Sequence, residues 1–148
     1  QLPFSIHYKK RKDQKIALIH AVICKGIDKE LLTPINPSKN FNSLDQTINI
    51  LYKLEFNLTS ILIRIEVINP HKEVVIYDYT ELILNDVKYE QTAFMCVPVL
   101  PQMEVGEWII NLICQDQIIF SQSFYYRELR SYTNKYQSYY AINTDYKV

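Results

Sequence analysis

Cysteine and histidine are the residue types in this chain that could bind a metal ion or supply a nucleophile and a base. The chain contains Cys24, Cys96 and Cys114, together with His7, His20 and His71. A structural zinc site needs about four closely placed ligands, and no CxxC spacing occurs here. We therefore expect no metal and no cofactor. Buried free thiols in a reducing, cytoplasmic compartment are the expected state of the cysteines, with one disulfide between two of them as the alternative.

Nucleophilic catalysis would need a cysteine beside a histidine. Cys96 and His71 could meet in space, because catalytic partners need not be close in sequence. However, Cys96 falls within an expected strand, and no glycine loop of the oxyanion type accompanies it. A solvated surface accounts equally well for the carboxylates Asp78 and Glu81. The sequence therefore indicates a protein that is not an enzyme.

Basic and aromatic residues gather at the two ends of the chain. A basic run occupies residues 7–15, and tyrosines recur at intervals of three and four residues in the last segment, 127–148. This spacing is typical of one face of a helix, and an extended segment laid on the sandwich is the alternative, because Tyr and Ser are mediocre helix formers. Tyrosine is favoured in protein interfaces because it buries a large ring while its hydroxyl stays polar. The expected partner-binding residues are Tyr132, Tyr136, Tyr139, Tyr140, Arg127 and Arg130.

These tyrosines could pack on the protein's own domain, on a separate protein or on a second copy of the chain. They could also stack on single-stranded nucleic acid while the basic residues of 7–15 and of the tail neutralise phosphates. The formal net charge of the chain is +0, so its overall charge does not favour nucleic acid. The expected function is a non-enzymatic protein–protein interaction or assembly module, and nucleic-acid binding is the alternative.

No apolar run approaches the ~18 residues that span a bilayer. The first residues, QLPFSIHYKKRKDQK, lack the apolar core and cleavage site of a secretory signal. We therefore expect neither a membrane span nor a secretory signal.

Strands are the elements expected to position these side chains, because β-branched and aromatic residues dominate the chain and suit a pleated surface. The length of 148 residues fits one domain. Residues 15–24 are apolar on both parities, which predicts a strand covered on both sides. Alternation of apolar and polar residues predicts strands over 47–58 and 61–69, a short strand follows over 74–79, and the signals over 82–84 and 88–97 are weaker. Residues 26–46 are a long connection rich in proline, serine and asparagine, in which Asp28 could cap one helical turn.

The segment from Val97 to Tyr126 carries the strongest pattern. Trp108, Ile110, Leu112 and Cys114 share one parity, a polar reversal follows at Asp116, and Phe120 and Phe124 then point inward. This layout resembles the last hairpin of bacterial immunoglobulin-like sandwich domains of unassigned function. Its parts, in order, are a proline loop, Gly106, an apolar strand, a short polar turn and a final strand. Asp116-Gln117 stands where that family has Asp-Gly.

The resemblance implies an all-β, immunoglobulin-like, two-sheet antiparallel sandwich over residues 1–126. The long 26–46 connection and a tyrosine-rich extension at 127–148 would complete it. An OB-fold barrel is the alternative architecture. The antibody order of Cys, Trp and Cys on separate strands is absent, because Trp108 and Cys114 share one strand. A Cys24–Cys114 contact between the sheets would mimic the usual bridge, but nothing in the sequence requires it.

Overall fold

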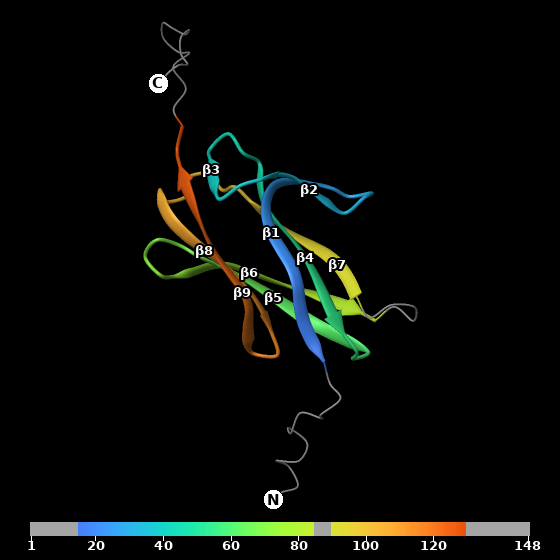
Figure 1. The fold of residues 1–148 in the computed structure, drawn as a ribbon. Coiled ribbons are helices and arrows are strands. Elements are labelled where there is room, and N and C mark those ends of the chain that lie inside the picture. Colours follow the sequence, from blue (N-terminus) through green and yellow to red (C-terminus); the bar gives the residue numbers. More distant parts are fainter. Residues whose placement is uncertain (1–14, 85–89, 130–148) are drawn as a thin grey trace, which may run out of the picture.

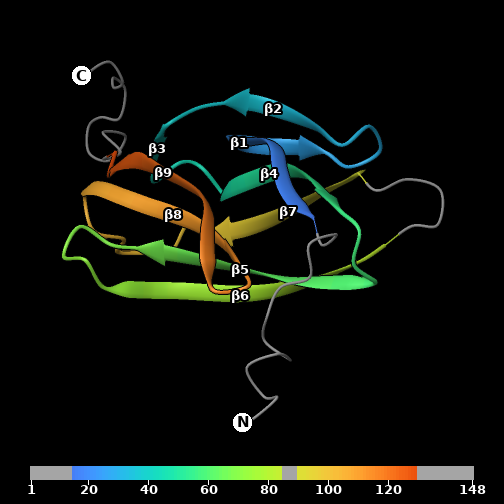
Figure 2. The ribbon, with the colours of Figure 1, turned by 60° about the horizontal axis from the view of Figure 1, so that its bottom comes forward.

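The computed structural model describes residues 15–84 and 90–129, which form two β-sheets packed face to face (Figures 1 and 2). Sheet A has the strand order β2-β1-β4-β7, and sheet B has the order β3-β9-β8-β5-β6. The strands are β1 (Ile16–Asp28), β2 (Thr33–Pro37), β3 (Asn40–Asn42), β4 (Thr47–Phe56), β5 (Ser60–Ile68), β6 (Val74–Ile83), β7 (Glu90–Pro98), β8 (Gly106–Cys114) and β9 (Gln117–Arg127). No helix of the described residues is long and apolar enough to cross a membrane.

The strand order is that of an immunoglobulin-like sandwich, as the sequence predicts. β1, β4 and β7 occupy the places of strands A, B and E, while β5, β8 and β9 occupy those of C, F and G, and β6 lies beside β5 as C′ does. Neighbouring strands are antiparallel, except that β3 runs parallel to β9. The division into 1–126 and 127–148 stays a prediction; β9 itself ends at Arg127.

The core lies between the sheets and follows the predicted alternation. In β4, Ile48, Ile50, Tyr52, Leu54 and Phe56 are at most 1% exposed. Alternate residues of β5 and β8 meet them from sheet B. Each such side chain contributes roughly 1.5–3 kcal/mol by leaving water.

Aromatic residues close the core at the start of β8. The Trp108 ring stacks on Phe124 with centroids 6.2 Å apart, and Phe124 meets Phe41 of β3 edge-on at 5.6 Å. Trp108 Nε1 donates a hydrogen bond to the Glu104 carbonyl at 2.8 Å, so its polar atom is satisfied. Gly106 has a φ of 138°, and a Cβ there would lie 3.1 Å from Pro70 Cγ, so the turn before β8 requires glycine.

The 26–46 connection is long, as predicted, and carries structure of its own. It contains the end of β1, the whole of β2 and the short strand β3. Asp28 Oδ1 accepts hydrogen bonds from the backbone N–H groups of Glu30 and Leu31, both at 3.0 Å, and Leu32 N–H donates to the Asp28 carbonyl at 2.7 Å. This capped turn stops after one cycle because Leu32 has a φ of 54° and directs the chain into β2.

Two predicted strand boundaries are wrong. Segments 74–79 and 82–84 are one continuous strand, β6, because Thr80 and Glu81 keep pairing with β5 although they interrupt the apolar pattern. β6 is the edge strand of sheet B, where polar side chains remain solvated and the alternation weakens.

The cysteines form no disulfide, and all three lie within the described residues. Cys24 lies on the outer face of sheet A, whereas Cys114 points into the core from sheet B, so the two cannot mimic the immunoglobulin bridge. Cys24 and Cys96 flank Asn49 on neighbouring strands. Two strand spacings separate them by about 10 Å, more than a disulfide spans. The expectation of burial holds for Cys24 and Cys114 but is wrong for Cys96, which is exposed on the edge strand β7.

Candidate protein-docking face

Most of the predicted partner-binding residues lie outside the described residues. Arg127 is exposed at the end of β9 and makes no ion pair with any described residue. Arg130, Tyr132, Tyr136, Tyr139 and Tyr140 fall in the undescribed segment 130–148, and the basic residues before Lys15 fall in 1–14. Lys15 itself lies 3.6 Å from Glu55. Both the tail hypothesis and the nucleic-acid hypothesis therefore stay predictions.

The outer face of sheet B is the surface where exposed apolar side chains gather. Strand register places Tyr79, Arg64, Ile113 and Ile118 in one row across β6, β5, β8 and β9. Leu62 on β5 lies one row further along the sheet, and Ile83 on β6 lies two rows further in the same direction. We use "sheet B face" for this outer surface, from Ile83 at one end to Tyr125 at the other.

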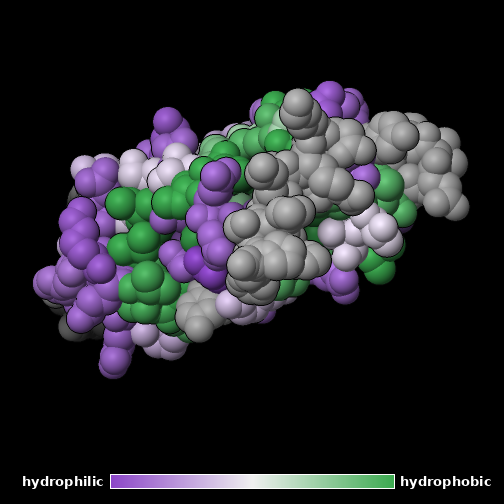
Figure 3. Space-filling model, turned by 90° about the horizontal axis from the view of Figure 1, so that it is seen from below, coloured by the Kyte–Doolittle hydropathy of each residue, from purple (hydrophilic) through white to green (hydrophobic). Residues whose placement is uncertain are grey.

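Exposure of these side chains is high for their size and apolarity. Leu62 is 53% exposed, Tyr79 48%, Ile83 65%, Ile118 60% and Tyr125 56%. Scattered apolar residues are ordinary on a protein surface, but a contiguous group on one sheet marks a candidate interaction site. Seen from below, the molecule shows hydrophobic patches between hydrophilic ones (Figure 3).

A shallow hollow of about 300 Å³ lies within the sheet B face. Its walls come from the start of β5, the middle of β6 and the β8–β9 turn, and include Ser60, Leu62, Arg64, Tyr79, Ile113 and Asp116. This combination of apolar walls with one guanidinium and one carboxylate suits a side chain or short segment of another polypeptide.

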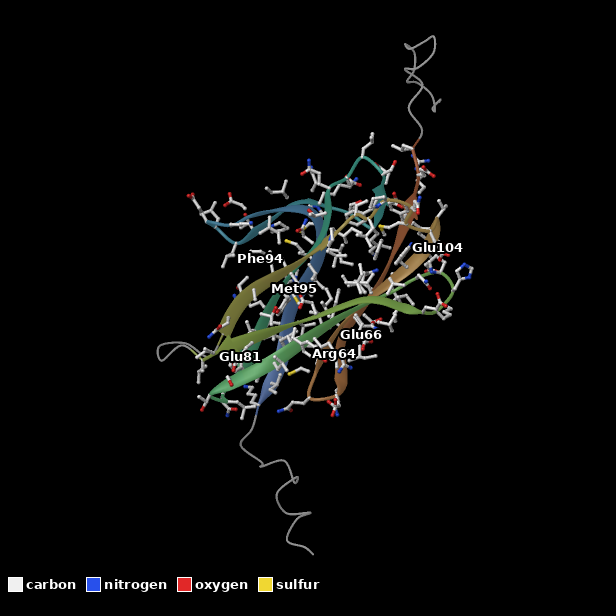
Figure 4. All side chains as sticks on the ribbon, turned by 180° about the vertical axis from the view of Figure 1, so that it is seen from behind. Arg64, Glu66, Glu81, Phe94, Met95 and Glu104 are labelled. Atoms are coloured by element: carbon white, nitrogen blue, oxygen red, sulfur yellow. The ribbon has the colours of Figure 1, made fainter. Side chains whose placement is uncertain are left out.

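Two buried polar atoms of the sheet B face make no hydrogen bond with described residues. Arg64 Nε lies 3.1 Å from Glu66 Oε2, close enough for an ion pair but without hydrogen-bond geometry. Asn111 is 6% exposed, and its Oδ1 has no donor among the described residues. Figure 4 shows Arg64 and Glu66 next to one another, with Glu81 nearer the end of β6. Buried groups of this kind usually have partners, but both atoms lie below the surface of the sheet B face, so a docked ligand would not contact either of them directly.

The charge of the sheet B face is acidic. Its described cations are Arg64 and, two residues after Tyr125 on the same side of β9, Arg127. They stand against four carboxylates, Glu66, Glu81, Glu107 and Asp116, which leaves a net charge of −2. The chain as a whole is formally neutral. A partner with basic residues therefore complements this face better than an acidic partner does.

Free strand edges next to this face are capped by side chains. Asp78 Oδ1 accepts a hydrogen bond from Tyr79 N–H at 2.8 Å on β6, and Gln91 Nε2 donates to the Ile83 carbonyl. On β9, Gln122 Nε2 donates to the Ser123 carbonyl at 3.0 Å. Capped backbone groups and a charged residue on an edge strand oppose the addition of another strand. Docking on this sheet therefore favours its face over its edges.

The sequence signal for this face is the position of Leu62. It shares the outward parity of Arg64 and Glu66, which the alternation of 61–69 assigns to solvent. An isoleucine at 113 and another at 118 repeat the anomaly on β8 and β9. Only the register reveals that these outward apolar residues are neighbours.

The described residues hold no group of three or more His, Cys, Asp or Glu side chains arranged to bind a metal ion. Burial raises the pKa of the Cys24 thiol above its ordinary value, and hydrogen bonds from the backbone of Ile35 and Gly26 oppose this shift. Burial also raises the pKa of the Tyr52 hydroxyl, with a smaller contribution from Cys114.

No protein-family model matches the chain, and no curated protein sequence matches it. Among solved structures, an immunoglobulin-like protein from Pseudomonas aeruginosa is similar, with a TM-score of 0.52 and 10% sequence identity over 79% of this chain and 100% of that one. The Pseudomonas fluorescens alkylpurine DNA glycosylase AlkC, solved with DNA containing an abasic site analog, gives a TM-score of 0.48 and 11% identity over 76% of this chain and 30% of the glycosylase. The first likeness shows that the chain has an immunoglobulin-like fold.

Proposed function

We propose that this protein is a non-enzymatic docking module that binds a protein partner through the sheet B face. The observation that carries this proposal is the contiguous exposure of Leu62, Tyr79, Ile83 and Ile118 on one sheet of a sandwich whose inner faces are fully packed. A partner that covers these side chains gains hydrophobic free energy at about 25 cal/mol per Å² of apolar surface.

Polar groups of the sheet B face would supply specificity. Arg64 and Asp116 place a guanidinium and a carboxylate in the lining of the hollow. A partner with a carboxylate and a cation at matching positions would pair with both, and a partner without them would not. The proposed interface thus combines apolar area with two charged groups.

The proposal includes a reducing compartment such as the cytoplasm. Cys24, Cys96 and Cys114 form no disulfide, and Cys96 is exposed on an edge strand. Exposed thiols persist where the glutathione and thioredoxin systems keep them reduced.

Replacement of Leu62 tests the proposal. In the full chain, Leu62→Asp places a carboxylate on an already acidic face, and Leu31→Asp makes the same change at a 72% exposed leucine in the β1–β2 turn. Proteins captured from an extract of the native cells are quantified by mass spectrometry for wild type and both variants. We expect at least one protein to be captured by wild type and Leu31→Asp but to fall at least about tenfold with Leu62→Asp, a loss of about 1.4 kcal/mol or more.

Identical capture by Leu62→Asp and Leu31→Asp would overturn the proposed docking face. Thermal unfolding of both variants provides the control for folding, since neither leucine is buried. Sedimentation of the purified wild-type chain over a range of concentrations shows whether a second copy is the partner.

A further inference from the structure

The sheet B face and the C-terminal segment 130–148 have complementary chemistry. The segment carries Arg130, Lys135 and Lys147 against the single carboxylate Asp145, a net charge of +2, together with five tyrosines. The sheet B face, with Arg127 included, carries a net charge of −2 and exposes Tyr79, Leu62 and Ile118. Tyrosine rings bury well against apolar side chains while their hydroxyls stay hydrated or bond to carboxylates.

Chain length permits the segment to reach the hollow of the same molecule. The last described residue, Leu129, is held at the end of β9 by Ser43, whose Oγ accepts from Leu129 N–H at 2.8 Å and donates to its carbonyl at 3.1 Å. The hollow lies at the opposite end of β9, beside Asp116, a distance of about 40 Å along the strand. Residues 130–148 span up to ~63 Å when extended.

Apolar and acidic side chains that could contact the segment lie along the sheet B face, from the end of β9 to the hollow. Tyr125, Ile109 and Ile68 lie on the sheet B face between the end of β9 and the hollow, and Glu107 pairs with Tyr125 across the strands. A tethered segment also acts at an effective concentration in the millimolar range, which favours a contact within one molecule over one between molecules.

We propose that segment 130–148 binds the sheet B face of its own chain and competes there with the protein partner. This inference rests on the proposed function, because it assigns a regulator to the same docking face. Apolar contacts of the tyrosines carry the affinity, since exposed ion pairs contribute only about 0–1 kcal/mol each. The cations of the segment and the carboxylates of the face set its register.

The test uses the full chain and one peptide. A four-serine variant replaces Tyr136, Tyr139, Tyr140 and Tyr146 by serine, because Tyr146 reaches up to ~56 Å from Leu129 and so spans the distance to the hollow. A matched polar control carries Thr133→Ser, Asn134→Ser, Asn143→Ser and Thr144→Ser. Methyl NMR signals of Leu62 and Ile113 are recorded for each protein. A synthetic peptide of residues 130–148 is then titrated into each.

We expect the Leu62 and Ile113 signals to shift in the four-serine variant and to stay in place in the polar control. The peptide should bind the four-serine variant at least about tenfold more tightly than wild type, and Leu62→Asp in the four-serine variant should remove this binding. Coinciding signals for wild type and the four-serine variant would overturn the inference. Equal peptide affinity for the two proteins would also overturn it, because the segment would then act between molecules.

The two proposals fail separately. Loss of partner capture with Leu62→Asp but no effect of the four-serine variant on the NMR signals removes only the role of the segment. A tyrosine-dependent contact with Leu62, without any difference in capture between Leu62→Asp and Leu31→Asp, removes the separate protein partner and leaves the contact within the chain.

Discussion

The outer faces of the two sheets differ in what covers them. On sheet A, Cys24, Asn49 and Leu51 point outward yet are 0%, 3% and 4% exposed. Lys29, in the β1–β2 turn, lies with its Nζ 5.8 Å from the centre of the Phe94 ring on β7. To reach β7 from the end of β1, the hairpin must cross the outer side of β4. Figure 1 shows this hairpin projecting on the side of β7.

No described element crosses the outer face of sheet B in the same way. Leu62 occupies an outward position on β5, as Leu51 does on β4, but Leu62 is 53% exposed. One sandwich therefore carries one outward leucine buried by its own chain and another left accessible. The difference separates an apolar residue that packs within the fold from one that stays accessible on its surface.

Truncation of these two leucines gives the largest expected contrast. Leu51→Ala should lower the free energy of unfolding by about 2–4 kcal/mol, because it leaves a cavity under the β1–β2 hairpin. Leu62→Ala should change it by no more than about 0.5 kcal/mol. Urea denaturation of both variants measures the contrast. Equal losses at the two positions would show that the two faces are covered to the same degree.

Thiol reactivity compares a covered and an uncovered site within sheet A. Cys96 is exposed, whereas Cys24 is buried and its pKa is raised by burial. A thiol reagent at pH 8 should therefore modify Cys96 on the order of 100-fold faster than Cys24, which must wait for local opening. Mass spectrometry of the time course identifies the order. Comparable rates would mean that the hairpin does not protect the outer face of sheet A.

Removal of the Tyr52 hydroxyl gives the smallest expected change in the free energy of unfolding. It compares a buried polar group of the core with the exposed side chains of the sheet B face. The hydroxyl is buried without a hydrogen-bond partner among described residues, whereas the Leu62, Tyr79 and Ile118 side chains of the sheet B face are exposed. Tyr52→Phe should therefore raise the free energy of unfolding by about 1 kcal/mol.

The same hydroxyl predicts a pH dependence. Burial raises the pKa of Tyr52 in the folded state above the unfolded value near 10, so the folded state disfavours ionisation. Its contribution is complete below the unfolded pKa near 10 and is lost progressively as the pH rises from there toward the raised pKa of the folded state, because the unfolded chain ionises first. Tyr52→Phe should remove this alkaline loss in denaturation curves recorded from pH 8 to 11. An unchanged slope would show that Tyr52 ionises equally well in both states.

Local patterns predict the elements well where one face is buried and one is wet. The alternation of Ile48 to Phe56 identifies β4 and its inward residues, because a strand repeats every two residues and the core selects one parity. The pattern fails in β6, because an edge strand is only partly covered and Thr80 and Glu81 interrupt the apolar run.

The candidate face was not predictable in the same way. Leu62, Ile113 and Tyr79 come from three strands separated by up to about fifty positions in the chain, and only the register places them in neighbouring rows. The tyrosine tail was predicted from spacing and composition, and its role depends on whether a surface exists to receive it. We propose the sheet B face as that surface, which gives the tail hypothesis a defined contact to test.

The amino-acid sequence by itself determines that this chain is an all-β sandwich, because hydrophobic alternation and turn residues act over a few neighbouring positions. The burial of Leu51 on the outer face of sheet A and the exposure of Leu62 on the outer face of sheet B are decided by tertiary structure alone. Strand pairing joins residues far apart in the chain, and coverage depends on where a distant segment comes to lie. Two outward leucines that look alike in sequence, Leu51 and Leu62, therefore differ in burial.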